Sequence, residues 1–324
     1  MPKKYIITVV ALLLATVMII AASLIGFERE EIPDGGESPV KDADEPFCLL
    51  VLGKDRVSGL TDVMMLVSFD IEQKRISVMQ IPRDTYADYG SKNHKKLNSA
   101  ASVIGEESLC EFLSSALGVN IDGYLTLELD ALRKTVDAIG GVEIYLPERL
   151  YYADPSQGLY IDLPAGEQLL DGKKAEMLVR YREGYAQGDI GRIDMQKRFL
   201  AALFKKVKSS VTPDSIYTLA SSIYPHVRTD VSMPLAAALA VKALGVDTSA
   251  VCFVTLPGEA VTGESGASFY VMSKQPTSSV LREYFFADGS VDKKQLFKNS
   301  QNEKFAAIYE KDIEYSVVYG NEFE

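Results

Sequence analysis

Three apolar runs near the start of the folded part of the chain predict buried β-strands. They are Phe47–Leu52, Val63–Phe69 and Ile76–Ile81, and Gly53 stops the first of them. Each run stays apolar almost without interruption, which is typical of a strand covered on both faces. The polar segment 71–75 is short enough to join the second and third runs as a hairpin.

Apolar residues at helical spacing predict two helices in the next part of the chain. The first lies between Gly105 and Gly118, and the later glycine stands where a helix C-cap is expected. The second helix runs from Asp130, which is placed to cap it, to Ile139, and Gly140 follows.

Further apolar segments continue the mixture of strands and helices. Val142–Leu146, Tyr160–Leu163, Val251–Leu256 and Phe269–Met272 are predicted strands, and residues 215–245 contain two predicted helices. We expect the last two strands to rejoin the sheet formed by the first ones. Because the elements intermix without a repeat, the predicted fold class is α/β (α+β), a mixed β-sheet sandwiched by α-helices.

The N-terminal residues predict the compartment. No charged residue occurs from Tyr5 to Phe27, and this segment gives about 34 Å of helix, enough to cross a bilayer core. Lys3 and Lys4 precede it and favour a cytoplasmic N-terminus. A cleaved signal peptide is the alternative, with Ala21–Ser23 as a faint cleavage signal. We therefore expect a single-pass protein of the cell membrane whose folded part is extracytoplasmic.

Composition divides the chain into five predicted regions. These are a cytoplasmic N-terminus (1–4), a transmembrane helix (5–27), an acidic linker (28–45), an extracytoplasmic folded domain (46–275) and a C-terminal extension of unassigned role (276–324). The linker is rich in Gly and Pro and nearly free of large apolar groups, so we expect it to be solvated. The last boundary is placed where the apolar pattern weakens.

Charge, cysteine and histidine content exclude several classes of function. The formal net charge is −11, from 34 Lys and Arg against 45 Asp and Glu, which repels nucleic acid. Cys48, Cys110 and Cys252 lie far apart and form no CxxC pair, which excludes a compact cysteine-based zinc site. His94 and His226 are too few for a multi-histidine metal site, and neither is assigned a role.

Two arginines, Arg180 and Arg182, are separated by a single residue in the segment EMLVRYREGY, residues 176–185. If residues 178–182 are extended, Arg180 and Arg182 share one face about 7 Å apart. That separation suits a pyrophosphate, because each guanidinium presents a fixed fork of donors to phosphate oxygens.

A stripe of polar residues follows these arginines. On a helix, Asp189, Arg192 and Gln196 share one face, and apolar residues such as Phe199 fall on the same side. The polar groups are therefore expected on the buried face, where they need partners or a function. The residues alone support two readings equally, a functional site and an interior network in which Asp189 caps the helix and pairs with Arg192.

Two earlier loops carry charged groups at strand ends. Asp55 and Asp62 can offer carboxylates to a hard cation such as magnesium (Mg2+), although Asp near Gly and Ser is more often a turn residue. Arg83 follows Pro82, which ends a strand, so its side chain emerges where sheet-based ligand sites tend to lie. A surface pair between Arg83 and Asp84 is the structural alternative.

These segments together resemble the signature blocks of the LytR-CpsA-Psr family. The matching blocks are LGKDRVSGLTDVMMLVSFD (52–70), MQIPRDTYADYG (79–90), HKKLNSA (94–100) and EMLVRYREGYAQGDIGRIDMQKRFLAALFKKV (176–207). The last block matches the family's Arg-x-Arg, Gly-Asp-x-Gly-Arg and following Gln without a gap, which makes the combined resemblance specific. It covers residues 47–208 and continues more weakly through the TLPG segment at 255–258.

The resemblance implies the family's fold and activity, which is the Mg2+-dependent transfer of a polyprenyl-pyrophosphate-linked glycopolymer onto peptidoglycan. Asp55 and Asp62 are then the implied metal ligands. The implied catalytic and substrate-binding residues are Arg83, Lys96, Asn98, Arg180, Arg182, Asp189, Arg192 and Gln196. Asp189 is the implied base for the acceptor hydroxyl. The family usually has Arg-Ser-Asp-Thr-Met where this chain reads Leu60-Thr61-Asp62-Val63-Met64, so one anion contact is missing.

The same residues allow other functions, which differ from the transferase in the acceptor molecule or in having no turnover. A polyprenyl-pyrophosphate phosphohydrolase would use the same Mg2+ and arginines with water as acceptor. A non-catalytic scaffold that holds the lipid pyrophosphate is a second alternative. The missing arginine near Leu60 keeps it open, whereas the intact Asp55, Asp62 and Arg182 argue against it. A DNA-binding regulator is disfavoured by the acidic charge, the absence of a basic recognition helix and the predicted membrane anchor. Whether the polymer is teichoic acid, capsule or another wall polysaccharide depends on pocket shape, which short motifs do not encode.

Overall fold

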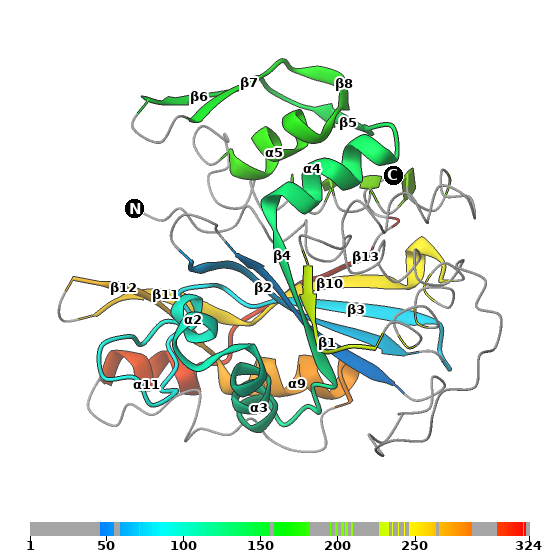
Figure 1. Ribbon diagram of the computed structural model, residues 1–324. Coiled ribbons are helices and arrows are strands. Elements are labelled where there is room, and N and C mark those ends of the chain that lie inside the picture. Colours follow the sequence, from blue (N-terminus) through cyan, green and yellow to red (C-terminus); the bar gives the residue numbers. More distant parts are fainter. Residues whose placement is uncertain are drawn as a thin grey trace.

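A computed structural model gives the fold of the chain (Figure 1). The residues that it describes are 46–54, 59–70, 72–155, 159–181, 195, 198–199, 202–203, 205–206, 209, 227–232, 235, 239, 243, 246–263, 266–286, 303–319 and 321. Within them no helix is long and apolar enough to span a membrane, and the predicted span at 5–27 lies outside them.

A seven-stranded mixed sheet forms the centre of the molecule, in the order β13-β10-β3-β2-β1-β4-β9. Its strands are β1 (Phe47–Lys54), β2 (Thr61–Asp70), β3 (Arg75–Gln80), β4 (Gly123–Glu128), β9 (Val227–Thr229), β10 (Val251–Thr255) and β13 (Val317–Tyr319). β1 pairs in parallel with β4 and β3 with β10, whereas the other pairs are antiparallel. The predicted mixed sheet and the hairpin between β2 and β3 are confirmed.

Helices cover both faces of this sheet (Figure 1). One side carries α4 (Leu129–Ala138) and α5 (Gly172–Arg180), and the other carries α3 (Glu106–Leu117) and α9 (Lys274–Tyr284). The short helices η1 (Leu97–Ser99) and α2 (Ala100–Ile104) precede α3, η4 (Thr248–Ala250) precedes β10, and α11 (Glu303–Glu310) contacts α9. The predicted helix between Gly105 and Gly118 is confirmed, and Gly118 ends it in the left-handed conformation.

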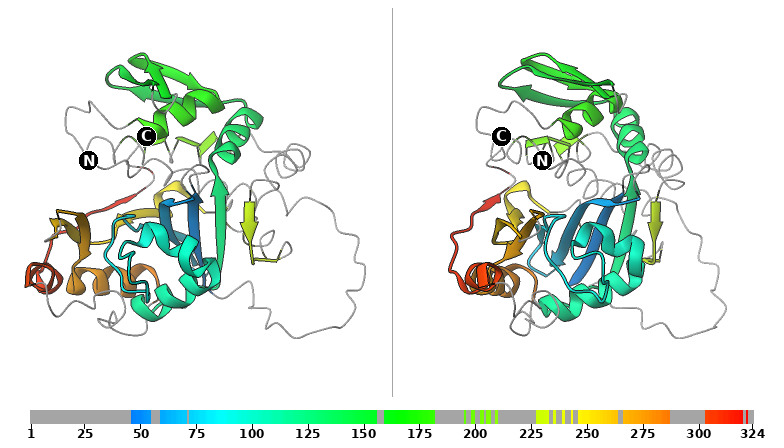
Figure 2. Two further views of the ribbon diagram at one scale, coloured as in Figure 1. Left: turned by 60° about the vertical axis from the view of Figure 1, so that its left-hand side comes forward. Right: turned by 90° about the vertical axis from the view of Figure 1, so that its left-hand side faces the viewer.

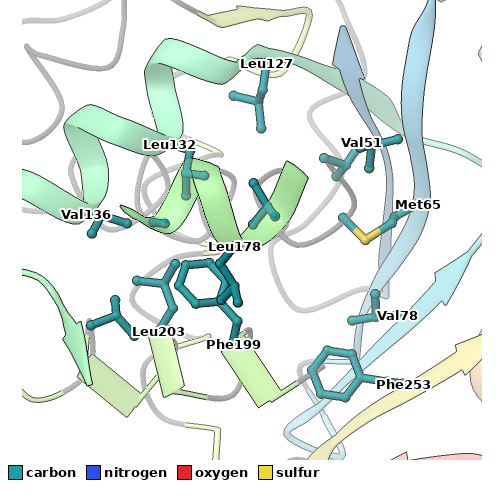
Figure 3. Close-up of a cluster of buried hydrophobic side chains, with 14 of the residues drawn as sticks. Val51, Met65, Val78, Leu127, Leu132, Val136, Leu178, Phe199, Leu203 and Phe253 are labelled. Carbon is teal, nitrogen blue, oxygen red and sulfur yellow. The ribbon is translucent and has the colours of Figure 1, made fainter. Parts of the chain in front are cut away.

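Alternate residues of the central strands enter two separate cores, which explains the unbroken apolar runs. In β1, Leu49 and Val51 belong to the core beneath α4 and α5, whereas Leu50 and Leu52 belong to the core beneath α3 and α9. Figure 3 shows the first core, with Val51 facing the side chains of α4 and α5. Burying one such side chain contributes about 1.5–3 kcal/mol, so covering both faces favours this strand strongly.

Three two-stranded sheets lie outside the central one. They are β5 (Val142–Leu146) with β8 (Gly166–Leu170), β6 (Leu150–Asp154) with β7 (Leu159–Leu163), and β11 (Gly258–Thr262) with β12 (Ser268–Met272). Both views of Figure 2 place β5–β8 at the opposite end of the molecule from α9 and α11.

Two sequence-based predictions need correction. The segment Phe269–Met272 was expected in the central sheet, but β12 pairs with β11 instead, while β10 does join the central sheet. Gly258 permits this pairing, because a Cβ there would overlap the backbone of Val271. Asp130 does not precede its helix as a cap, since α4 begins at Leu129 and Asp130 lies in its first turn. A carboxylate there still complements the helix dipole.

Residues after 275 pack against the same cores and sheet. Phe305 and Tyr309 of α11 are buried in the core beneath α9, and β13 pairs with β10 at the sheet edge. Within the predicted helical range 215–245, β9 spans Val227–Thr229, and positions 235, 239 and 243 are helical.

Candidate functional site

Several strand ends meet at one edge of the central sheet. β1, β3, β4 and β10 run in the same direction, because β2 is antiparallel to both β1 and β3 and the other two pairings are parallel. The C-terminal ends of these strands therefore lie at the same edge as the start of β2. Ligand sites of open α/β sheets are usually at such an edge.

Asp62 and Arg83 form an ion pair at this edge. Asp62 is the second residue of β2, and Arg83 Nη1 donates a hydrogen bond to its Oδ1. Pro82 lies two residues after the end of β3, and the Thr85 N–H donates to its carbonyl (2.9 Å) to close a turn. Both charged side chains are largely buried, with 12% of Asp62 and 13% of Arg83 exposed. The pair is therefore not the surface pair between neighbours that the sequence allowed.

The start of η1 brings Lys96 and Asn98 to the same place. The backbone N–H of Asn98 donates to the carbonyl of Arg83 (2.9 Å), and that of Leu97 donates to Thr85 (3.0 Å). Lys96 Nζ lies 3.1 Å from Asp84 Oδ1, so this lysine supplies the partner of the buried Asp84 carboxylate. The structure thus gathers four predicted site residues, which are Asp62, Arg83, Lys96 and Asn98.

A buried glutamate that the sequence did not indicate, Glu106, lies next to the end of β1. Glu106 Oε1 accepts hydrogen bonds from Lys54 Nζ (2.6 Å) and from Arg228 Nη2 (2.5 Å). Burial raises the pKa of Glu106, but the hydrogen bond from Lys54, the bond to its own backbone N–H and the two cationic charges outweigh burial, so the net pKa is lowered. Since Lys54 is the last residue of β1, Glu106 holds the C-terminal end of this strand.

Arg180 lies in a different charged cluster from the one expected. The extended conformation proposed for 178–182 is wrong for residues 178–180, because α5 continues through Arg180, and Tyr181, the last described residue of this segment, is extended. Asp171 caps this helix by accepting from the Lys174 N–H. Arg180 Nη1 donates to Glu176 Oε1 (3.0 Å), and Arg133 Nε donates to the other oxygen of the same carboxylate.

The remaining predicted site residues, Asp55, Arg182, Asp189, Arg192 and Gln196, lie outside the described residues. Among the residues that the structure does describe, no three His, Cys, Asp or Glu side chains gather as a metal site. Asp62 nevertheless fits the predicted metal, because its carboxylate is the hard oxygen donor that Mg2+ prefers.

Comparison with known families gives one match over most of the chain. The model of the LytR_cpsA_psr family matches residues 25–284. This range contains every residue of the cluster at the sheet edge and the whole of α5.

Curated relatives and solved structures agree with that match. The Bacillus subtilis protein named polyisoprenyl-teichoic acid–peptidoglycan teichoic acid transferase TagV is 28% identical over 200 residues, which are 58% of this chain and 50% of TagV. Regulatory protein MsrR of Staphylococcus aureus strain COL is 30% identical over 60% of this chain and 58% of its own. The chain thus spans about half to three fifths of these relatives. The crystal structure of B. subtilis TagV has the same fold, with a TM-score of 0.61, 23% identity and coverage of 76% of this chain and 99% of that one.

Proposed function

Because this chain belongs to the LytR-CpsA-Psr family, we propose that it transfers a glycopolymer from a polyprenyl pyrophosphate donor to a hydroxyl group of peptidoglycan. The observation that carries the proposal is the cluster of Asp62, Arg83 and Lys96 at the sheet edge, inside the matched range. It combines a carboxylate for a cation with cationic groups for phosphate oxygens. The name of TagV describes a teichoic acid transfer of the same kind.

The proposed reaction is a phosphoryl transfer. The acceptor hydroxyl oxygen forms a bond to the phosphorus that carries the glycopolymer, the P–O bond to the polyprenyl phosphate breaks, and polyprenyl phosphate leaves. Asp189 takes the proton of the hydroxyl. Arg83, Arg180, Arg182, Arg192 and Gln196 hold the pyrophosphate oxygens.

Lys96 and Asn98 support this arrangement from the neighbouring segment. Lys96 pairs with Asp84, the residue after Arg83, and the Asn98 N–H donates to the Arg83 carbonyl. Mg2+, held by Asp55 and Asp62, would neutralise charge on the leaving group. Preorganised charge of this kind is usually the largest contribution to catalysis of such a transfer.

We also propose that residues 5–27 anchor the chain in the cell membrane with the folded part outside. The anchor would keep the site close to its lipid donor. Protease added to intact cells whose wall has been removed should then degrade the folded part. Protection until the membrane is permeabilised would contradict this orientation.

The test of the activity uses the full chain in detergent micelles, a synthetic polyprenyl-pyrophosphate glycan and peptidoglycan fragments, with Mg2+ or with a chelator. We expect glycan to appear on peptidoglycan only with Mg2+. The Arg83→Gln variant should lose this transfer activity. Arg149→Gln is the matched control, because Arg149, the residue before β6, also pairs with a carboxylate, that of Asp162 on β7, but is 60% exposed.

Each alternative reading gives a different result in the same assay. Release of lipid phosphate without labelled peptidoglycan would replace the transferase with a phosphohydrolase. Retention of the lipid with no turnover would leave a binding scaffold, and activity that persists in the chelator would remove Mg2+ from the proposal.

A further inference from the structure

The buried carboxylate of Glu176 joins two helices and two arginines. Glu176 lies in α5 with only 6% of its surface exposed. Its Oε2 accepts from Arg133 Nε of α4, and its Oε1 accepts from Arg180 Nη1 at the end of α5. A buried charge is tolerated only when it is paired and hydrogen-bonded, and here both oxygens have a cationic partner.

Arg133 is the partner that compensates the charge of Glu176. The hydrogen bond that Arg133 donates to Glu176 raises the pKa of the Arg133 guanidinium, so Arg133 stays charged. Arg133 also lies 3.6 Å from Asp130, whose side chain is one third exposed and therefore more strongly screened by solvent. Since Arg133 already binds one oxygen of Glu176, Arg180 does not have to neutralise this carboxylate alone.

The packing of α5 on α4 holds the carboxylate in place. Gly172 starts α5 so close to α4 that a Cβ there would overlap the backbone of Arg133. The Gly172 N–H donates to Asp137 Oδ1 (2.7 Å), which ties the first turn of α5 to the last turn of α4. Glu176 therefore presents its oxygens from a fixed helix, four residues before Arg180.

Arg180 keeps donors for another ligand in this arrangement. A guanidinium carries five N–H donors, and the bond to Glu176 uses one of them. One third of the Arg180 side chain is exposed. An arginine held at one nitrogen loses less freedom when its other donors bind a phosphate than an arginine that is free to rotate.

We propose that Glu176 is a positioning residue for the donor site, which orients Arg180 toward the pyrophosphate while Arg133 compensates its charge. This inference rests on the proposed function, because it assumes that Arg180 binds the pyrophosphate. It adds a residue that carries no phosphate contact itself, since a carboxylate would repel the ligand. Glu176 acts only through Arg180.

The test is a double-mutant cycle on pyrophosphate binding, measured by calorimetry on the full chain in detergent with Mg2+ and inorganic pyrophosphate as the probe. We expect Arg180→Gln to weaken binding about tenfold or more, as for loss of a charged hydrogen bond. Glu176→Gln should weaken it about threefold to tenfold, for the partial loss of orientation of that same donor. In the Arg180→Gln background, Glu176→Gln should have no further effect, because its action passes through Arg180.

Three other results distinguish a failure of this inference from a failure of the proposed function. Equal weakening by Glu176→Gln in both backgrounds would mean a merely structural role and overturn the inference. Weakening by Arg180→Gln but none by Glu176→Gln would overturn the inference and leave the proposed function intact. No effect of Arg180→Gln would remove Arg180 from the proposed donor site and the inference with it.

Two control variants keep the cycle interpretable. Glu167→Gln removes a carboxylate from the exposed face of β8 and should not change binding, which excludes an effect of net charge. If Glu176→Gln fails to fold, the double variant Arg133→Leu with Glu176→Leu replaces the ion pair by apolar side chains, a change that is often neutral for stability. It should weaken pyrophosphate binding as Glu176→Gln would, and unchanged binding would again overturn the inference.

Discussion

Replacing Arg83 by Gln should lower both the free energy of unfolding and the affinity for pyrophosphate. Replacing its partner Asp62 by Asn should lower the free energy of unfolding but raise the affinity when a chelator is present. Arg83→Gln removes the guanidinium that pairs with the Asp62 carboxylate, which is 12% exposed. Removing one partner of a buried ion pair costs about 3–5 kcal/mol, but glutamine can still donate one neutral hydrogen bond. We therefore expect a loss of about 1–3 kcal/mol in the free energy of unfolding.

Asp62→Asn should cost a similar amount of stability, and the double variant should recover most of it, because both charges of the ion pair are then removed together. Urea unfolding followed by far-UV circular dichroism measures these changes, since the chain has no Trp for fluorescence. Arg149→Gln, the exposed control, should not change the midpoint measurably.

Pyrophosphate binding gives the sharper distinction between these two variants. In the presence of a chelator, Asp62→Asn should strengthen binding, because it releases Arg83 from its carboxylate partner and removes a negative charge. With Mg2+ the same variant should weaken binding, because a metal ligand is lost. Arg83→Gln should weaken binding in both conditions, by about tenfold or more. If both variants shift binding in the same direction in the chelator, Arg83 does not exchange between Asp62 and the phosphate, and the reasoning is refuted.

Three further predictions concern buried groups away from this pair. Because the pKa of Glu106 is lowered, its contribution to stability is present above pH 4.5 and is lost as pH falls through the folded-state pKa. Glu106→Gln should thus lower stability at neutral pH by about 1–3 kcal/mol, and urea curves should show the difference from the parent shrinking in acid. Burial raises the pKa of the Cys110 thiol to about 12, so mass spectrometry should find Cys110 alkylated by iodoacetamide at pH about 8.5 only after unfolding. Gly172→Ala forces a Cβ against Arg133 and should destabilise the chain by about 1–3 kcal/mol in the same urea assay.

The central strands were predictable because their environment is simple. A strand buried on both faces must be apolar at every position, and Phe47–Leu52 has no competing pattern. α3 was equally clear, since its apolar face ends at a glycine in the left-handed conformation. In both cases the signal lies within a dozen residues of sequence.

Elements that depend on distant partners were not predictable in the same way. β9 pairs with β4 across about a hundred residues, and the three residues of β13 pair with β10 from near the C-terminus. A strand of three residues has no periodicity to read. The alternation of Arg180 and Arg182 suggests a strand, which is why the extended prediction for 178–180 is wrong. The helical signals of this segment are the cap Asp171 and the spacing of Ala175, Leu178 and Val179.

The two buried glutamates were missed for a related reason. Glu106 and Glu176 stand among polar residues on amphipathic helices, where a glutamate is normally solvated. Their partners Lys54, Arg228 and Arg133 lie 52, 122 and 43 residues away. Only the folded chain brings these cations to the carboxylates, so no local pattern distinguishes them from surface charges.

The continuity of β4, α4 and α5 links the sheet edge to the Arg180 cluster. β4 pairs with β1, α4 follows β4 without a linker, and α5 packs on α4. Leu178, two residues before Arg180, is buried in the same core as Val51 of β1 (Figure 3). Protein interiors are close-packed and deform little, so the end of α5 is held at a fixed position relative to the end of β1. Binding one pyrophosphate between charged groups on separate elements requires such fixed spacing, because small displacements of the contacting groups reduce rates strongly.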